Sequence, residues 1–526
     1  MVLAAFSLKE NYWDEFELSD KDIEFIYNHL LEIETPLTPQ ELINVLVEER
    51  IQQEIKAAEQ QRLSGGEVYL PKETYEVEQQ LTFPAFGWRQ GKVIEKRSGW
   101  NPDHGDFDVI KIHFDDGEEK EFAARFEAHV LNAPPDLEGD NIPTVESVVA
   151  TYGKSLVSRL EEGLFANSDF VRIAFKWFPR ALLLDVNTGH LNLAEAVLDM
   201  EGGGPVSTPT LLKQLDLAAD ENPKLVEFSL DLALQEDPRF DEVGPAGEIL
   251  WYLKRLEPNG VQETPIPLRY TEQDYDRDLL TSEMLELERV LDDELSPLEP
   301  ITTVGDEVTI TLLYPHWRAG TLPLTPRVRP FFPTAYETPR IRFILVDGDT
   351  GEKFSGWVVS NEGYVFGLES WYRERELMPG SIVRIRPGKK PGEVIIKVDA
   401  QRSRRDWVRT VLVGTDGGAV FATLKQIVTA AYDERLAIAI PDMEMLDNAW
   451  EFQKKEKTPF ERTVVNMARE LTKLNTQGHV HASELYAAVN LMRRCPPGPI
   501  MALLASRPWF VHVGDLHFRF NDSEMK

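Results

Sequence analysis

A basic run at Arg384–Arg409 holds the side chains of this sequence whose chemistry is easiest to interpret. It contains nine basic and three acidic residues, a balance of nine minus three, or +6, in a chain whose net charge is −33. Trp407 lies within the run, and Trp371 and Tyr372 lie upstream. Cationic side chains can hold phosphates while aromatic rings stack on bases, so the pattern predicts contact with nucleic acid. The candidate residues are Arg384, Arg386, Lys389, Lys390, Arg402, Arg404, Arg405 and Arg409.

Two other interpretations of the basic run remain open. The run can form the solvated edge of a sheet, where lysines prevent aggregation between strands. It can also dock against an acidic stretch of the same chain, Glu257–Pro300, which holds thirteen acidic residues and three arginines. We expect that stretch to be a linker with a solvated charged face and a helix at Ser282–Leu295.

A second group of basic residues lies near the C-terminus. In a helix-turn-helix, the recognition helix enters the major groove and needs basic or amide side chains. The charged residues of Asn222–Asp237, which contains the predicted third helix of the central module, are one lysine (Lys224) and four acids (Glu227, Asp231, Glu236 and Asp237). Phosphates would be repelled by this helix, so its module is expected to contact protein instead. The C-terminal candidates for nucleic-acid binding are Arg493, Arg494, Arg507 and Arg519.

Catalytic patterns are weak in this sequence. A metal-dependent nuclease motif needs an acid and a lysine two residues apart, whereas Asp108 and Lys111 are three apart and point to opposite faces of a strand. The acidic residues and histidine of Asp103–Asp108 lie in a segment typical of surface loops, and metal sites need convergent ligands. The single cysteine, Cys495, has no identifiable catalytic partner. We therefore expect no enzymatic activity, no catalytic residue, no metal and no cofactor.

The elements that must position these residues recur in a common order. In His190–Arg255 a helix, a glycine-rich break, two further helices and a hairpin follow one another, which is the order of a winged helix. Thr208 is expected to be the N-cap of the second helix in this stretch. At the C-terminus, three helices within Pro459–Ala505 precede a hairpin that turns at Gly514-Asp515.

The same order begins near the N-terminus. Asp20–Leu31 is predicted to be a first helix, and Leu37 precedes a second. Thr38 and Glu41 have the spacing of a capping box, in which each side chain accepts a hydrogen bond from the other residue's amide.

Two regions are predicted to be rich in strands. Tyr75–Asn132 is expected to form a small barrel, with its last strand at His129–Leu131. Ile301–Asp399 is expected to hold six strands. Arg402–Pro441 is predicted to combine a strand pair with a helix at Thr423–Tyr432.

Several segments resemble known families. "IYNHLLEIETPLTPQELINVL" (Ile26–Leu46), and "GHVHASELYAAVNLM" through "WFVHVGDLHFRF", resemble winged helices of the HARE type, which include the N-terminal domain of the bacterial RNA polymerase delta subunit. "LTFPAFGWRQGKVIEKR" resembles SH3-like and Tudor-like modules, some of which contact RNA polymerase. "RIRFILVDGDTGEKFSGWVVSNEGYVFGL" with "MPGSIVRIRPG" resembles DNA-binding pseudobarrels of the B3 kind. These resemblances imply a transcription or nucleic-acid setting without catalysis.

Length and composition restrict the class of protein. A chain of 526 residues predicts about three to five domains. One cysteine favours a reducing cytoplasm, and no segment has the pattern of a signal peptide or a membrane span. Because phosphate neutralisation drives nucleic-acid affinity, the net charge of −33 favours local basic patches or a basic protein partner over a generally basic surface.

The sequence thus predicts an α+β multidomain protein in which winged-helix modules are interleaved with small β-barrel-like domains. The expected domains are residues 1–72 (winged-helix-like), 73–133 (SH3/Tudor-like barrel), 144–256 (helices and central winged helix), 257–300 (acidic linker), 301–442 (β-rich) and 456–521 (C-terminal winged helix). The expected function is a non-enzymatic accessory factor that bridges a protein partner, with RNA polymerase as the candidate, and nucleic acid. The alternatives are an acidic protein-interaction scaffold and a restriction-type nuclease.

Overall fold

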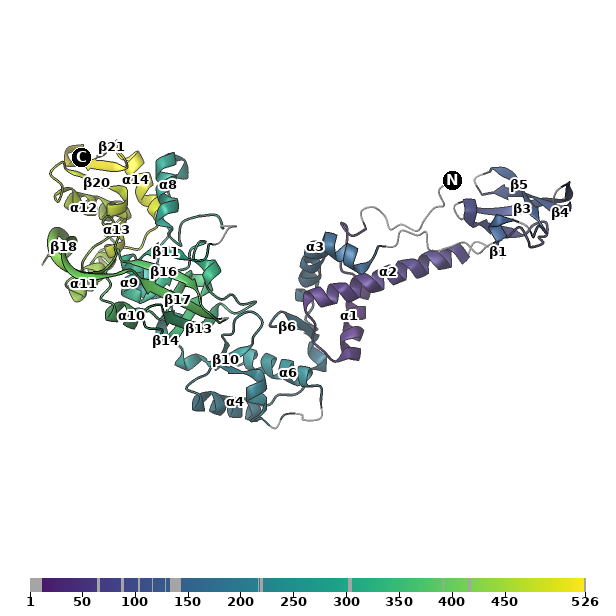
Figure 1. Ribbon diagram of the computed structural model, residues 1–526, viewed down its shortest axis with the longest axis horizontal. Helices are drawn as coiled ribbons and strands as arrows, with labels where there is room; N and C mark the ends of the chain where they lie inside the picture. Colours follow the sequence, from purple (N-terminus) through teal and green to yellow (C-terminus); the bar gives the residue numbers. More distant parts are fainter. Residues whose placement is uncertain are drawn as a thin grey trace. The chain divides into compact units, whose positions relative to one another are not determined.

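The computed structural model shows a mixed α+β protein of several domains, as the sequence predicts (Figure 1). The structure describes residues 12–63, 67–86, 89–102, 105–115, 117–127, 129–132, 143–215, 217, 221–300, 305–390, 392–414 and 418–524. The chain divides into two compact units. The first comprises Met1–Asp185 and Asp220–Phe228, and the second comprises Val186–Ala219 and Ser229–Lys526.

The first unit contains three helices and a hairpin that lie far apart in sequence. They are α1 (Asp20–Ile33), α2 (Pro39–Leu63), α3 (Val145–Phe165), β6 (Phe170–Ile173) and β7 (Lys176–Pro179). Leu37, just before α2, pairs with Trp177 of β7: the Leu37 amide donates at 3.3 Å and the Trp177 amide donates back at 2.7 Å. The N-terminal module therefore begins with α1, Leu37 and α2, and is completed by α3 and the β6–β7 hairpin. A separate β region is inserted in the chain between α2 and α3.

This pairing differs from the predicted boundary, which placed residues 144–178 with the central module. The bond between Leu37 and Trp177 joins residues about 140 positions apart, and no local pattern signals such a contact. The local prediction at α2 is confirmed. The Thr38 amide donates to Glu41 at 2.8 Å and the Glu41 amide donates to the Thr38 hydroxyl at 3.3 Å.

The inserted region is a five-stranded sheet in the order β1-β2-β3-β4-β5. Its strands are β1 (Glu67–Val68), β2 (Gln80–Phe83), β3 (Arg89–Asn101), β4 (Gly105–Phe114) and β5 (Glu119–Ala124). The predicted alternation in β4 is confirmed, because Ile110, Ile112 and Phe114 are buried. The region begins earlier than residue 73, since β1 pairs with β2 and the buried Tyr69 belongs to its core. The strand expected at His129–Leu131 is wrong, because a 3₁₀ helix occupies Val130–Asn132.

The central module follows the predicted order. Its elements are α4 (Thr188–Met200), β8 (Val206–Ser207), α5 (Thr208–Leu212), α6 (Pro223–Glu236), β9 (Phe240–Glu242) and β10 (Leu250–Leu253), with the sheet order β8-β10-β9. Ser207, and not Thr208, is the N-cap of α5. Thr208 is buried, and its hydroxyl donates to Asp231, to which the Trp251 indole also donates at 2.9 Å.

The acidic stretch Glu257–Pro300 is not a solvated linker, which corrects the prediction. It contains α7 (Asn259–Gln262), α8 (Ser282–Leu291) and short 3₁₀ turns. Leu280 and Met284 belong to the same core as the C-terminal module, and several of the acidic side chains are buried. The buried acidic residues are Glu257, Glu288, Asp292 and Asp293.

A seven-stranded sheet follows, in the order β11-β16-β17-β13-β14-β15-β12. All six strands expected within Ile301–Asp399 are present, and β12 is an additional one. The elements are β11 (Val308–Thr311), α9 (Tyr314–Ala319), β12 (Thr321–Pro323), β13 (Arg340–Asp347), β14 (Lys353–Val359), β15 (Tyr364–Phe366), α10 (Glu369–Glu374), β16 (Ile382–Pro387) and β17 (Glu393–Val398). β13 and β17 are parallel, and the other pairs are antiparallel.

A long two-stranded hairpin leaves this sheet, formed by β18 (Ala400–Val413) and β19 (Ala419–Ala430). The helix predicted at Thr423–Tyr432 is therefore wrong. Residues such as Leu424 and Lys425 suit a helix locally, but pairing along β18 satisfies the backbone of this stretch as a strand.

The C-terminal module repeats the order of the central one. Its elements are α11 (Met443–Lys455), α12 (Phe460–Thr472), β20 (His479–His481), α13 (Ala482–Met492), α14 (Pro497–Ser506), β21 (Phe510–Gly514) and β22 (His517–Phe520). The sheet order β20-β22-β21 matches β8-β10-β9 of the central module. α12, α13, α14 and the hairpin lie where the sequence predicts them.

The assignment of β7 to the N-terminal helices predicts the effect of Trp177→Ala. Trp177 is 1% exposed, and its loss should cost about 3–5 kcal/mol of stability. Hydrogen exchange should show lost amide protection in α1 and α2, although these helices end more than 100 residues earlier in the chain. Trp100→Ala, at a position that is 69% exposed, should leave this protection unchanged. Normal protection of α1 and α2 in the Trp177 variant would contradict the assignment.

Candidate nucleic-acid interface

The basic run does not form one surface, because β17 divides it. Three exposed cations lie at one end of β17: Arg386 near the end of β16, and Lys389 and Lys390 in the turn that follows. Arg402 and Arg405 are exposed on β18, beyond the other end of β17. β17 has six residues, so its two ends lie about 20 Å apart. The two groups of cations are therefore separate surfaces and do not form a single binding site.

Three arginines of the run are already paired with carboxylates. Arg384 donates to Asp399 at 2.5 Å and to Glu307 at 3.0 Å, and Arg404 lies 2.9 Å from Asp406. The strongest case is Arg409, whose side chain is 12% exposed and pairs with Glu484 of α13 at 2.5 Å. Arg409 thus fixes β18 to the C-terminal module and is not available to a phosphate.

The C-terminal candidates divide in the same way. Arg507 makes two bonds to Glu461, at 2.7 and 3.0 Å. Arg493 donates to the Thr458 carbonyl at 3.3 Å. Arg519 is exposed on β22.

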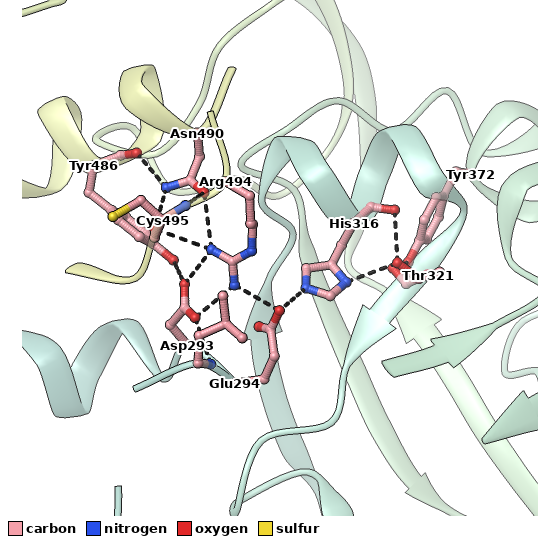
Figure 2. Close-up of polar contacts among 10 residues, drawn as sticks. Asp293, Glu294, His316, Thr321, Tyr372, Tyr486, Asn490, Arg494 and Cys495 are labelled. Carbon is pink, nitrogen blue, oxygen red and sulfur yellow. Dashed lines mark hydrogen bonds and ion pairs between the residues drawn. The ribbon is translucent and has the colours of Figure 1, made fainter. Parts of the chain in front are cut away.

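Arg494 is buried, which contradicts its predicted role in binding nucleic acid (Figure 2). Its guanidinium donates to both oxygens of Asp293, at 2.7 and 2.8 Å, and to Glu294 at 2.7 Å. The Arg494 and Asp293 side chains are each 1% exposed. A charge so deeply buried needs these partners, and no phosphate can reach it.

The ion pair continues as a buried network into the seven-stranded sheet (Figure 2). Glu294 lies 3.0 Å from His316 of α9, whose second ring nitrogen is 2.9 Å from the Thr321 hydroxyl. On the other side, Tyr486 of α13 donates to Asp293. Burial alone would raise the pKa of Glu294, but Arg494 and His316 hold that pKa well below its ordinary value.

The acidic stretch also covers the helix that would read DNA. In a helix-turn-helix this is the helix before the wing, which is α14 in the C-terminal module. Most of α14 is buried, and a side chain at Gly498 would collide with the Tyr275 hydroxyl from the acidic stretch. All of α13 except Glu484 is buried as well. α14 is therefore not open to a major groove, whereas Arg519 in the predicted wing is exposed.

One face of the β18–β19 hairpin remains open. The register places Arg405 opposite Ile427, and Trp407 opposite Lys425. Opposite residues of an antiparallel pair share a face, so these four side chains lie together. Trp407 and Ile427 are each 62% exposed, and the Lys425 ammonium lies 5.1 Å from the centre of the indole. We call these four residues the hairpin face.

The sequence alone identified only half of the hairpin face. Arg405 and Trp407 were found from the charge pattern. Lys425 and Ile427 were missed because their segment was predicted to be helical. Had it been treated as a strand, pairing with β18 would have brought them to the same side.

A polar cleft of about 530 Å³ adjoins the hairpin face. Trp407 and Arg409 of β18 form one wall, and the other includes Asn475, which follows α12, and His479, the first residue of β20. Beyond this cleft, Phe421 of β19 is buried in the core of the C-terminal module. The cleft is therefore the boundary between the covered and the open part of the hairpin.

The other candidate chemistry lies elsewhere. Asp108 of β4 pairs with Lys96 at 3.3 Å, and Lys111 lies on the opposite face of that strand. Asp103 and His104 lie outside the described residues. Burial raises the pKa of the Cys495 thiol well above its ordinary value, which disfavours the reactive thiolate. Among the described residues, no group of three or more histidine, cysteine or acidic side chains could hold a metal ion.

The buried network predicts the cost of Arg494→Met. Because this change removes the guanidinium that neutralises two buried carboxylates, it should destabilise the second unit by about 3–5 kcal/mol. Adding Asp293→Asn and Glu294→Gln should recover part of the loss. Arg493→Met, beside it in sequence but half-buried, should cost about 1 kcal/mol or less. Denaturant unfolding measures all three, and equal stability of both single variants would contradict the network.

His481 predicts a pH dependence of the C-terminal module. Burial, Arg435 and His517 lower the pKa of His481 to about 4, and its Nδ1 accepts the Ser483 amide at the start of α13. The unfolded chain takes up a proton near pH 6.5 and the folded chain only near 4, so stability should fall as pH drops through this window, by at most about 3 kcal/mol.

His481→Asn tests this dependence, because asparagine also caps helices but does not titrate. The variant should lose less stability than the parent between pH 7.5 and 4.5 in thermal unfolding. Parallel curves for the two proteins would contradict the assignment.

Comparison with known proteins gives no further guide to this interface. No protein-family model matches the chain, and no match to a curated protein or to a solved structure was found. Within the described part of the chain, no helix is both long and apolar enough to cross a bilayer. The function must therefore be inferred from the site itself.

Proposed function

We propose that the protein is a non-enzymatic accessory factor of transcription or nucleic-acid metabolism that bridges nucleic acid and a protein partner. The hairpin face carries the nucleic-acid half of this proposal. It combines an exposed indole with cations that form no salt bridge among the described residues, Arg405 and Lys425 on the face and Arg402 nearby. Such a surface suits contact with phosphates and bases. The single buried cysteine is consistent with a cytoplasmic setting.

The repeated order of elements supports the setting. In the central and C-terminal modules a helix, a short strand, two helices and a hairpin follow one another, and the last strand is the middle one of three. The N-terminal module has the same order with Leu37 in place of the short strand, and β7 lies between β6 and Leu37. This order is that of winged helices, and the resemblance to HARE-type modules makes RNA polymerase the candidate partner.

A groove in the second unit suits the protein partner. It encloses about 760 Å³ between residues 265–267, α9 and α11. Ile266, Tyr314 and Trp450 give it apolar walls, and Lys454, Lys455 and Lys457 line one end. Apolar walls with a few charged groups are typical of surfaces that bind partners or ligands.

An acidic scaffold that binds only protein is the second candidate. The exposed Trp407 and Ile427 favour it, because apolar residues at a surface also serve protein contacts. Nuclease treatment separates the two candidates: partners of a pure scaffold remain bound after nucleic acid is digested.

Reversing charge at the hairpin tests the nucleic-acid half. Arg402→Glu with Arg405→Glu should weaken retention of labelled DNA in a low-salt shift assay by at least about tenfold, and should lower the salt dependence by about two counterions. Lys389→Glu with Lys390→Glu makes the same charge change at the β16–β17 turn and should have little effect. Equal losses in both variants, or no retention by the parent protein, would overturn this half.

A further inference from the structure

The hairpin face and the cleft beside it show features that favour one class of nucleic acid over another. We propose that they form a binding site for single-stranded nucleic acid, with a base stacked on Trp407 and the backbone following Arg402, Arg405 and Lys425. This inference rests on the proposed function and specifies the ligand of that site.

The first argument is the exposure of the indole. Trp407 remains 62% exposed although it lies beside a folded module that buries Phe421 of the same hairpin. Bases of a duplex are stacked on one another, and a protein can stack on one only by flipping it out at a cost of a few kcal/mol. Bases of a single strand are already free to stack, which is worth roughly 1–3 kcal/mol per base on an aromatic side chain.

The second argument is the absence of a duplex reader in the same module. α14, the helix that would enter a major groove, is covered by the acidic stretch, and α13 is buried except at Glu484, which pairs with Arg409. The cations of the hairpin face lie on a strand pair and not on a helix. A site on a strand pair with an exposed aromatic ring is the arrangement that single-strand binders use.

The third argument is the shape and polarity of the cleft. Its volume of about 530 Å³ is in the range that holds a small organic ligand, and so suits about one nucleotide. Asn475 and His479 on its wall hydrogen-bond to each other and to Gln477, and they can exchange these partners for the edge of a base. The pairing edge of a base is free for such contacts only in a single strand.

The charges around the cleft indicate where the base and the phosphates would lie. Two carboxylates on its wall are occupied, Asp406 by Arg404 and Tyr432, and Glu484 by Arg409. Glu434 also lines the cleft and would repel a phosphate there. The phosphates are therefore placed on the outer hairpin face, with Arg402, Arg405 and Lys425, and the base points into the cleft.

Fluorescence anisotropy with the full-length protein tests the inference. The probes are a labelled oligothymidine of about 20 nucleotides, long enough for one site, and a blunt duplex of the same length at the same low salt. The single strand should bind at least about tenfold more tightly than the duplex. Trp407→Ala should weaken single-strand binding by roughly 5- to 100-fold, and Trp407→Phe should retain most of it.

The controls separate this inference from the proposed function. Trp100→Ala removes an equally exposed indole from the other unit and should change neither affinity. Unfolding of Trp407→Ala should match the parent, because the residue is exposed. If duplex and single strand bind equally and Trp407→Ala changes neither, the single-strand site is overturned while nucleic-acid binding stands. If neither probe binds the parent protein, both proposals fail.

Discussion

The buried contact of Arg494 with Asp293 and Glu294 is the constraint on which the second unit depends. None of these charges can be buried alone, since an unpaired ion in the interior costs several kcal/mol. They come from the acidic stretch and from the loop between α13 and α14, and His316 extends the contact to the seven-stranded sheet. The contact therefore holds three parts of the chain together and fixes the acidic stretch against the C-terminal module.

That placement decides which surfaces remain for a partner. With the acidic stretch on α14, the C-terminal module uses its third helix for internal packing. Arg409 then ties the hairpin to α13 through Glu484, so the inner part of the hairpin is covered and its outer part projects beside the cleft. Many of the cations in the basic run and near the C-terminus are paired or buried. Among the described residues, the candidate cations that stay exposed and unpaired lie on strands and turns.

Local patterns in the sequence predicted local structure well. The capping box of Thr38 and Glu41, the six strands of the large sheet and the C-terminal helices each follow from spacing within about ten residues. What depends on distant partners could not be predicted. Leu37 pairs with Trp177, which follows the inserted sheet in the chain, and Arg494 forms an ion pair with Asp293, about 200 residues away. Arg494 and Arg493 look alike in sequence, and only the packing of the chain decides that one is buried.

The strong acidity of the chain does not conflict with a nucleic-acid site on the hairpin. Exposed charges separated by more than about 8 Å are largely screened at physiological ionic strength, so a phosphate responds mainly to the nearest side chains. Many of the acidic residues near the candidate cations are already paired, as Asp399 is with Arg384 and Asp406 is with Arg404. The local charge at the hairpin face is thus determined by Arg405 and Lys425, and Trp407 provides its aromatic surface. The remaining negative charge of the body would restrict the proposed ligand to that face, because a nucleic acid extending past it would be repelled.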